Sequence, residues 1–195
     1  DANTEGTLNT AVGTNSGDNL TTASFCSLVG ANIDTGDVSN NNCNALGYGL
    51  TAVSGYTTLG ITTSDIRAAH GNTTWSTVSD ERVKKDITDS TAGLSFINDL
   101  RPRTFKYKNK GDLPEEFNGY EEGSTEAYKN SNTNHGFIAQ EVKAAIDSHS
   151  EITDGFKMWD VRESGQQEVG EAAVIPILVK AIQELSEKVA ALEAK

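Results

Sequence analysis

The stretch STVSDERVKKD, residues 76–86, stands where the composition of the chain changes. Six acidic residues and one basic residue precede Ser79, whereas 22 acidic and 15 basic residues occupy the rest of the chain. A length of 195 residues accommodates one or two domains. We therefore expect a domain boundary close to Ser79.

The spacing of Ser79 and Lys84 has two interpretations. Ser79 can be the N-cap of a helix, with Asp80 and Glu81 in the first turn beside the positive end of the helix dipole. The same geometry lets the stem of Lys84 bend back toward the Ser79 hydroxyl, which a neutral amine can deprotonate for nucleophilic attack. Nearby cations favour a neutral amine and nearby acids oppose it. The spacing alone leaves both interpretations open.

The first part of the chain contains a short repeat. Its copies NTAVG, CSLVG, CNALG and YTTLG end at Gly13, Gly30, Gly47 and Gly60. Each copy predicts a short strand followed by a turn in which glycine supplies a positive φ angle. One such unit buries too little alone, so the copies are expected to stack into a β-solenoid, either within one chain or with several chains stacked together.

The repeats resemble the left-handed β-roll of trimeric bacterial adhesin heads and of some phage tail fibres, over residues 6–61. On this register the expected core is the aliphatic column Val12, Val29, Leu46 and Leu59. Cys26 and Cys43 fall on adjacent rungs and are expected to be buried free thiols. The alternative is a flexible polar stalk, because 42 of the first 78 residues are Thr, Ser, Asn or Gly.

The rest of the chain predicts a mixture of strands and helices. Residues 62–78 are a connecting segment that ends in TWSTV, which favours extended structure. FKYK and FKMWDVRE, at 105–108 and 156–163, indicate strands. Residues 109–136 are polar and rich in helix breakers, which predicts a long excursion, either an arm that wraps a neighbouring subunit or a disordered loop.

The C-terminal segment 174–195 shows a heptad pattern typical of a coiled coil. Its short length indicates a zipper that closes an assembly already begun. β-branched a positions with Leu at d favour two strands, whereas the roll repeats imply three, and we expect three. A surface helix packed on its own domain is the alternative. The seam consists of Ile175, Leu178, Ile182, Leu185, Val189 and Leu192.

Four blocks, SDERVKKDI, LSFINDLRPRTFKYK, HGFIAQEVKAAI and AAVIPILVKAIQELSEKVAALEAK, together resemble the C-terminal intramolecular chaperone domain of phage endosialidase tail spikes and tail fibres. The resemblance covers residues 79–195. It implies a self-cleaving serine peptidase, with Ser79 as nucleophile, Lys84 as base and scission between Val78 and Ser79.

Four more residues are candidates for a supporting role. Asp80 and Arg82 fit the motif of that family and are expected to brace the turn, with a solvated ion pair as the alternative. His135 and Gln140 flank GFIA and are candidates to approach the dyad, although a loop histidine and a surface glutamine are simpler interpretations.

The expected fold class is α+β, with a trimeric β-roll stalk over 1–61, a connecting segment over 62–78, and a mixed α+β chaperone domain over 79–195 that ends in a long coiled-coil helix. The resemblance implies a homotrimer in the virion that folds an upstream fibre segment and releases its chaperone domain in the host cytoplasm. The alternative is a structural adhesin with a permanent trimerisation cap and no cleavage. A hydrolase acting in trans would need a pocket and an oxyanion hole that the sequence does not indicate.

Other function classes are disfavoured by charge and composition. The formal net charge of −12 argues against binding to nucleic acid or to an anionic membrane. The basic stretch RPRTFKYKNK, residues 101–110, indicates one exposed strand face. Two cysteines without paired spacing do not predict a zinc site. No cofactor and no metal is expected.

Overall fold

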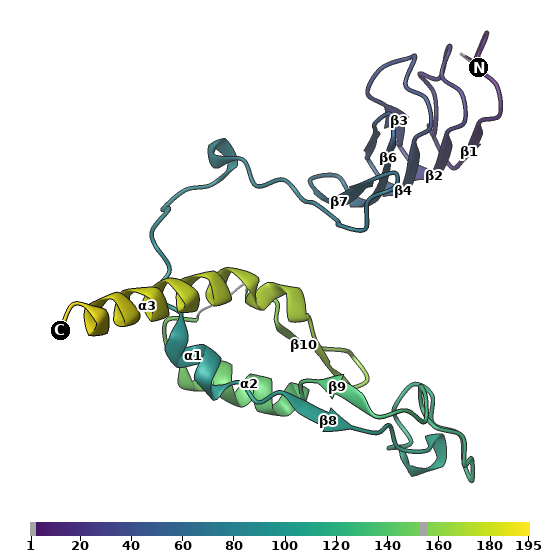
Figure 1. The fold of residues 1–195 in the computed structure, drawn as a ribbon. Helices are drawn as coiled ribbons and strands as arrows, with labels where there is room; N and C mark the ends of the chain where they lie inside the picture. Colours follow the sequence, from purple (N-terminus) through teal and green to yellow (C-terminus); the bar gives the residue numbers. More distant parts are fainter. Residues whose placement is uncertain (1–2, 153–155) are drawn as a thin grey trace. The chain divides into compact units, whose positions relative to one another are not determined.

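The repeats form a β-solenoid in which each copy contributes one short strand to a sheet. The computed structural model describes residues 3–152 and 156–195, and the chain divides into two units, Asp1–Ile87 and Thr88–Lys195 (Figure 1). The main sheet of the first unit has the order β1-β2-β4-β6-β7. Its strands are β1 (Thr10–Val12), β2 (Ser27–Ala31), β4 (Asn44–Tyr48), β6 (Tyr56–Ile61) and β7 (Ser64–Ala69).

The four repeat strands pair in parallel and in the predicted register. Val12 pairs with Val29, Val29 with Leu46, and Leu46 with Leu59. Two short strands, β3 (Asp34–Thr35) and β5 (Thr51–Ala52), form a second parallel pair. β7 reverses direction and pairs antiparallel with β6. The prediction of a β-solenoid is therefore confirmed for a single chain.

The glycines that end the repeats have the predicted backbone conformation. Gly30 and Gly47 have φ angles of +133° and +149°. A Cβ atom on Gly30 would lie 1.7 Å from the carbonyl oxygen of Gly47, and one on Gly47 would lie 1.8 Å from that of Gly60. Only glycine lets consecutive rungs approach this closely.

The predicted solenoid core was wrong by one residue. Val12, Val29 and Leu46 are 57%, 39% and 56% exposed. Side chains alternate across a strand, and the preceding position points inward. That position is occupied in β2 and β4 by Leu28 and Ala45, which are buried. The interior is filled by Leu20, Ala23, Cys26, Leu28, Ile33, Cys43, Ala45, Leu50 and Ala52.

The predicted burial of both thiols is confirmed. Cys26 and Cys43 are free and fully buried in the solenoid. Burial raises the pKa of the Cys43 thiol to about 12, and its hydrogen bond with Cys26 adds to the shift. Both sulfur atoms therefore belong to the apolar interior.

The connecting segment is only partly extended. A bridge between Arg67 and Ser76 ties its second half to β7. The described chain from Thr77 to Ile87 contains one short element, the 3-10 turn η1 (Glu81–Val83). Apart from the half-buried Asp80, every residue from Gly71 to Thr91 is exposed.

The described part of the second unit has three helices, and Phe96 of the first is fully buried in the core. The helices are α1 (Leu94–Asp99), α2 (Ala139–Ser148) and α3 (Ile175–Glu193), and η3 (Glu171–Val174) leads directly into α3. The apolar core of this unit consists of Ala92, Phe96, Leu100, Val142, Ala145, Met158, Val174 and Ile177.

Two antiparallel strand pairs complete the second unit. β8 (Arg103–Phe105) pairs with β9 (Asn134–Gly136), and β10 (Trp159–Val161) pairs with β11 (Gln167–Val169). The predicted excursion connects β8 to β9 and contains the 3-10 turn η2 (Lys110–Asp112). It extends beyond the strand pair in Figure 1 and is held together by the bridge between Asn109 and Ala127 and by ion pairs from Lys110 to Glu121 and Glu126. The described residues include no helix that is both long enough and apolar enough for a membrane span.

Candidate functional site

Ser79 and Lys84 are in direct contact. The Lys84 Nζ atom donates a hydrogen bond to Ser79 Oγ over 2.6 Å. Between them the chain forms η1 and not the α-helix that the capping interpretation predicted. Lys84 follows that turn in an extended conformation, with φ −114° and ψ 153°. The short turn therefore brings the amine back to the hydroxyl.

The cap of this turn is Asp80 and not Ser79. Asp80 Oδ1 accepts hydrogen bonds from the backbone N–H of Arg82 over 2.8 Å and from the Arg82 Nε–H over 2.9 Å. The other carboxylate oxygen, Asp80 Oδ2, accepts a hydrogen bond from the Arg82 Nη2–H over 2.6 Å. These two residues therefore brace the turn by charge-assisted hydrogen bonds.

The brace pairs one of the nearby acids with a cation. The hydrogen bonds from Arg82, first from its side chain and then from its backbone, lower the pKa of Asp80, and Asp80 raises the pKa of Arg82. Among the described residues no ion pair involves Lys84. Its short contact in this structure is thus with the serine hydroxyl.

The dyad is open to solvent, in a stretch that mixes charged residues with three exposed aliphatic side chains. Ser79 and Lys84 are exposed, and so are the three aliphatic residues near them. Val78, Val83 and Ile87 are 62%, 68% and 63% exposed. A single chain therefore leaves the pair in water.

His135 and Gln140 lie in the second unit. His135 is on β9 and Gln140 is in the first turn of α2, where it is exposed. Because Ser79 and Lys84 belong to the first unit, an approach of either residue to the dyad stays a prediction.

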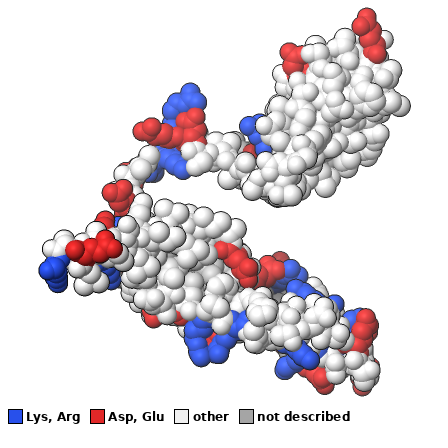
Figure 2. Space-filling model, viewed as in Figure 1, with Lys and Arg blue, Asp and Glu red and all other residues white. Residues whose placement is uncertain are grey.

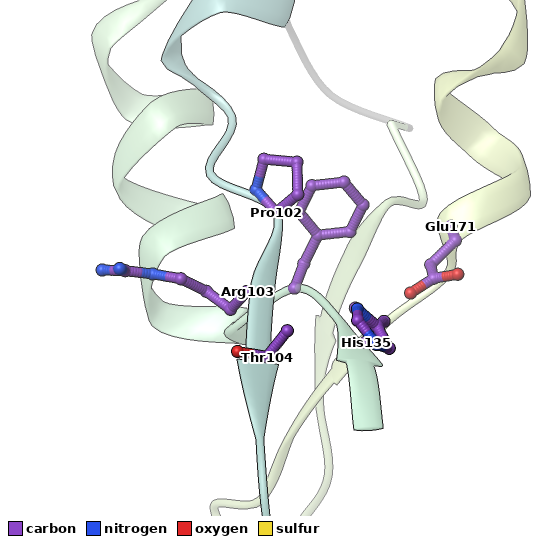
Figure 3. Close-up of a pocket in the computed structure, with 7 residues that line it drawn as sticks. Pro102, Arg103, Thr104, His135 and Glu171 are labelled. Carbon is purple, nitrogen blue, oxygen red and sulfur yellow. The ribbon is translucent and has the colours of Figure 1, made fainter. Parts of the chain in front are cut away.

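His135 lines a pocket of about 520 Å³. Figure 3 shows Glu171 of η3 directed toward His135, while Arg103 points away from the pocket. The Arg103 side chain instead binds Glu141 of α2 through Nε–Oε2 at 2.9 Å and Nη2–Oε1 at 2.5 Å. The lining residues are Pro102, Arg103, Thr104, His135, Gly136, Phe137 and Glu171.

Sequence reasoning missed Glu171 and Glu141. Glu141 lies in the block HGFIAQEVKAAI, but its partner Arg103 is 38 positions away in the chain, and Glu171 lines the pocket with His135, 36 positions away. Only the pairing of β8 with β9 and the packing of the helices bring them to these places. No group of three or more His, Cys, Asp or Glu side chains in residues 3–152 and 156–195 is arranged as a metal site.

Comparison with protein families gives one match. Residues 79–150 match the model of a peptidase family described as the chaperone of endosialidase. The match begins at Ser79, includes Lys84, His135 and Gln140, and ends before α3. It confirms the resemblance over the first three sequence blocks, while the fourth block at 172–195 lies outside the match, and it supports an intramolecular chaperone role. Neither a curated protein nor a solved structure matches the chain.

Proposed function

We propose that this chain is the C-terminal end of a phage tail fibre or tail spike whose chaperone domain drives trimerisation and then releases itself by cutting between Val78 and Ser79. The observation that carries the proposal is the 2.6 Å hydrogen bond between Lys84 Nζ and Ser79 Oγ, at the start of the region that matches the endosialidase chaperone family. The upstream fibre segment is the folding client, the working state is a homotrimer, and the virion is its location. The released domain would remain in the host cytoplasm.

The reaction is an attack of the chain on its own backbone. Lys84, once neutral, takes the hydroxyl proton of Ser79, and Oγ attacks the carbonyl carbon of Val78. The bond from that carbon to the Ser79 nitrogen breaks, and Lys84 returns the proton to the departing nitrogen. An ester then joins Val78 to Ser79 Oγ. Water hydrolyses it to the Val78 carboxylate and restores the serine hydroxyl.

Assembly supplies what the single chain lacks. Removal of water favours the neutral form of an amine, yet Ser79 and Lys84 are exposed in one chain. The exposed side chains of Val78, Val83 and Ile87 give a neighbouring copy an apolar surface to cover. Burial on association would activate the pair only after the chains have come together, so cleavage would report correct assembly.

The C-terminal helix supports the trimerisation step. α3 uses Ile177 and Ala181 to pack in its own unit, and both are buried. Every residue of the heptad seam remains exposed, from 38% at Leu178 to 69% at Leu192. The helix therefore packs on its own domain and still presents an apolar stripe that other copies can bind.

The exposure of the dyad also favours a second candidate function. A permanent trimerisation cap on a structural adhesin would keep the same seam and would leave the hydrogen bond between Ser79 and Lys84 without chemical consequence. In that case α3 would close the fibre and the chain would stay whole. Cleavage is the property that separates the two candidates.

Ser79→Ala and Lys84→Ala test the cleavage directly. We expect purified wild-type protein to yield fragments 1–78 and 79–195, with a new N-terminus at Ser79 that N-terminal sequencing or mass spectrometry detects. Each variant should stay whole, because one lacks the nucleophile and the other lacks the base. Lys85→Ala is the matched control and should cut normally. An intact wild-type chain that is a folded trimer would rule out the peptidase and favour the cap.

A further inference from the structure

The outward side of the main sheet carries an apolar face that the fold of one chain does not use. Its middle row runs across all five strands in register, and each member pairs directly with the next. Four of the five are between 39% and 57% exposed, and Leu59 is half-buried. The row consists of Val12, Val29, Leu46, Leu59 and Ile66.

A second apolar row runs beside the first. Ala31, Tyr48 and Ile61 pair in register, two positions beyond the middle row. Tyr48 is 48% exposed and Ile61 is 59% exposed. We call these two rows together the outer face.

The outer face is not explained by the needs of a single chain. The solenoid interior is already filled by buried side chains from the opposite side of the same strands, such as Leu28 and Ala45. Preference for extended structure does not explain it either, because threonine satisfies that preference in water. The neighbouring outward row is polar, with Thr10, Ser27, Asn44 and Thr57 in register. The sequence thus distinguishes two kinds of row on one surface.

Charge identifies the occupant of the outer face. The chain carries a formal net charge of −12, so copies repel one another over most of their surface. Every outward position of β1, β2, β4, β6 and β7 is uncharged, and the solenoid surface seen in Figure 2 has few charged side chains compared with the second unit. An acidic or basic partner would find no complementary group here. A second copy meets neither repulsion nor an unpaired charge.

The outer face is too small to hold the chains together by itself. Five strands about 4.8 Å apart span roughly 19 Å, so two rows cover a few hundred Å². A stable interface buries about 800 Å² on each partner. The face can therefore set the register between chains that another element has already joined, but it is too small to join them alone.

We infer that the outer faces of three copies pack against one another in the assembled fibre, with the middle row nearest to the threefold axis. This inference rests on the proposed trimer and adds the surface by which the stalks meet. The α3 seam would join the chains, and the outer face would align their rungs.

Cysteine cross-linking of the uncut full chain tests the contact. In the Ser79→Ala background, Leu46→Cys places a thiol in the middle row, where threefold symmetry brings equivalent residues together. Val38→Cys is the matched control, because Val38 is 46% exposed and lies outside the outer face. After mild oxidation with diamide, we expect disulfide-linked dimers of Leu46→Cys on a non-reducing gel, at least tenfold more than for Val38→Cys. The native thiols of Cys26 and Cys43 are buried. The Ser79→Ala protein without an added cysteine therefore gives the background rate of cross-linking.

A second measurement separates this inference from the proposed function. Light scattering gives the mass of the same samples, and circular dichroism verifies that they are folded. A trimer in which Leu46→Cys cross-links no better than Val38→Cys would overturn the outer-face contact and leave the chaperone proposal standing. A folded chain that is monomeric at all concentrations would instead remove the assembly on which both depend.

Discussion

His149 is a buried histidine held between two carboxylates. Its Nε2 atom lies 2.7 Å from Asp99 Oδ2, and its Nδ1 atom lies 2.8 Å from Glu151 Oε1. Only a protonated ring can donate to both. The side chain is 8% exposed and packs edge to face on Phe96, with ring centroids 5.4 Å apart. His149 therefore joins the end of α1 to the end of α2 at the core.

The stability contribution of His149 should depend on pH. The hydrogen bond to Asp99, followed by that to Glu151, raises the pKa of His149 above its ordinary 6.5. Its contribution is therefore complete below about pH 6.5 and is lost as the pH rises through the higher value of the folded state. The hydrogen bond from His149 lowers the pKa of Glu151 below its ordinary 4.5. The stability contributed by Glu151 is therefore complete above about pH 4.5 and disappears as the pH falls through the lower pKa of the folded state.

His149→Gln tests this pH window. We expect the loss of unfolding free energy, measured by urea denaturation, to be largest between about pH 4.5 and 6.5 and to shrink as the pH rises, because the wild-type ring loses its proton through its raised folded-state pKa. His70→Gln is the control, since His70 is exposed and its ring forms hydrogen bonds with the neutral side chains of Asn44 and Thr57. A loss that stays constant from pH 5 to 9 would mean that the ion pairs contribute nothing and that only packing matters.

At the scale of elements, α1 depends on a distant carboxylate. The helix has six residues, and its N-cap, Gly93, has no side chain to accept the free backbone N–H groups. Glu184 of α3 supplies the missing acceptor, because its Oε2 accepts the Leu94 N–H over 2.9 Å. A cap that comes from 90 residues away fastens α1 to α3.

Glu184→Ala should weaken this attachment. We expect a loss of about 0.5–2 kcal/mol in unfolding free energy, the usual cost of removing a cap. Hydrogen exchange should show faster opening of α1, while α2 is less affected. Glu187→Ala changes the same residue type three positions later on α3 and should leave stability within about 0.5 kcal/mol. Equal losses in the two variants would show that α3 contributes only general helix propensity.

The elements also show what a sequence can and cannot predict. The glycine spacing predicted the rungs because a positive φ angle and a 1.7 Å approach exclude every other residue. It could not predict which side of each strand faces inward, since Leu28 and Val29 are both aliphatic and a shift of one residue exchanges the faces. The heptad pattern identified the exposed stripe of α3, but its other face, with Ile177 and Ala181, depends on the position of α1.

The dyad illustrates the same limit at the candidate site. Five residues of separation placed Lys84 within reach of Ser79, and the structure has this contact through a 3-10 turn in place of a helix. The choice between them depends on Asp80, whose side chain caps the turn and binds Arg82. Asp99 and His149, which are hydrogen-bonded in the structure, are 50 residues apart in the chain, so no local pattern could have indicated their contact.

At the scale of the whole molecule, each unit leaves apolar surface in water. The first unit exposes the outer face and the aliphatic residues near Ser79, and the second exposes the α3 seam. Exposed apolar surface of this extent usually marks a site of association. A threefold β-structure depends on contacts between chains that order slowly, so a domain that joins the chains first raises their local concentration. If the proposed cleavage releases that domain, the proposed fibre would be kinetically trapped, because refolding would lack its template.

The last prediction concerns the dependence of cleavage on assembly. The double variant Ile182→Ser and Leu185→Ser removes two side chains of the seam that are 64% and 46% exposed, so the fold of the second unit should survive. We expect a folded monomer by circular dichroism and light scattering. Its cleavage should be at least tenfold slower than that of wild type, because Lys84 stays in water. Val179→Ser is the control, since Val179 is 51% exposed on the same helix but lies outside the heptad seam.

The two outcomes of this experiment assign different causes to the reaction. If the folded monomer stays whole while Val179→Ser trimerises and cuts, burial of the amine by neighbouring chains is the step that starts the chemistry. If the monomer cuts as fast as the trimer, the turn around Asp80 is sufficient by itself, and scission cannot report assembly. Cleavage of the wild-type protein over a series of concentrations decides between the two outcomes without further variants. If association activates the reaction, the rate constant of cleavage rises with protein concentration below the midpoint of assembly. If the reaction needs only one chain, the rate constant does not change with concentration.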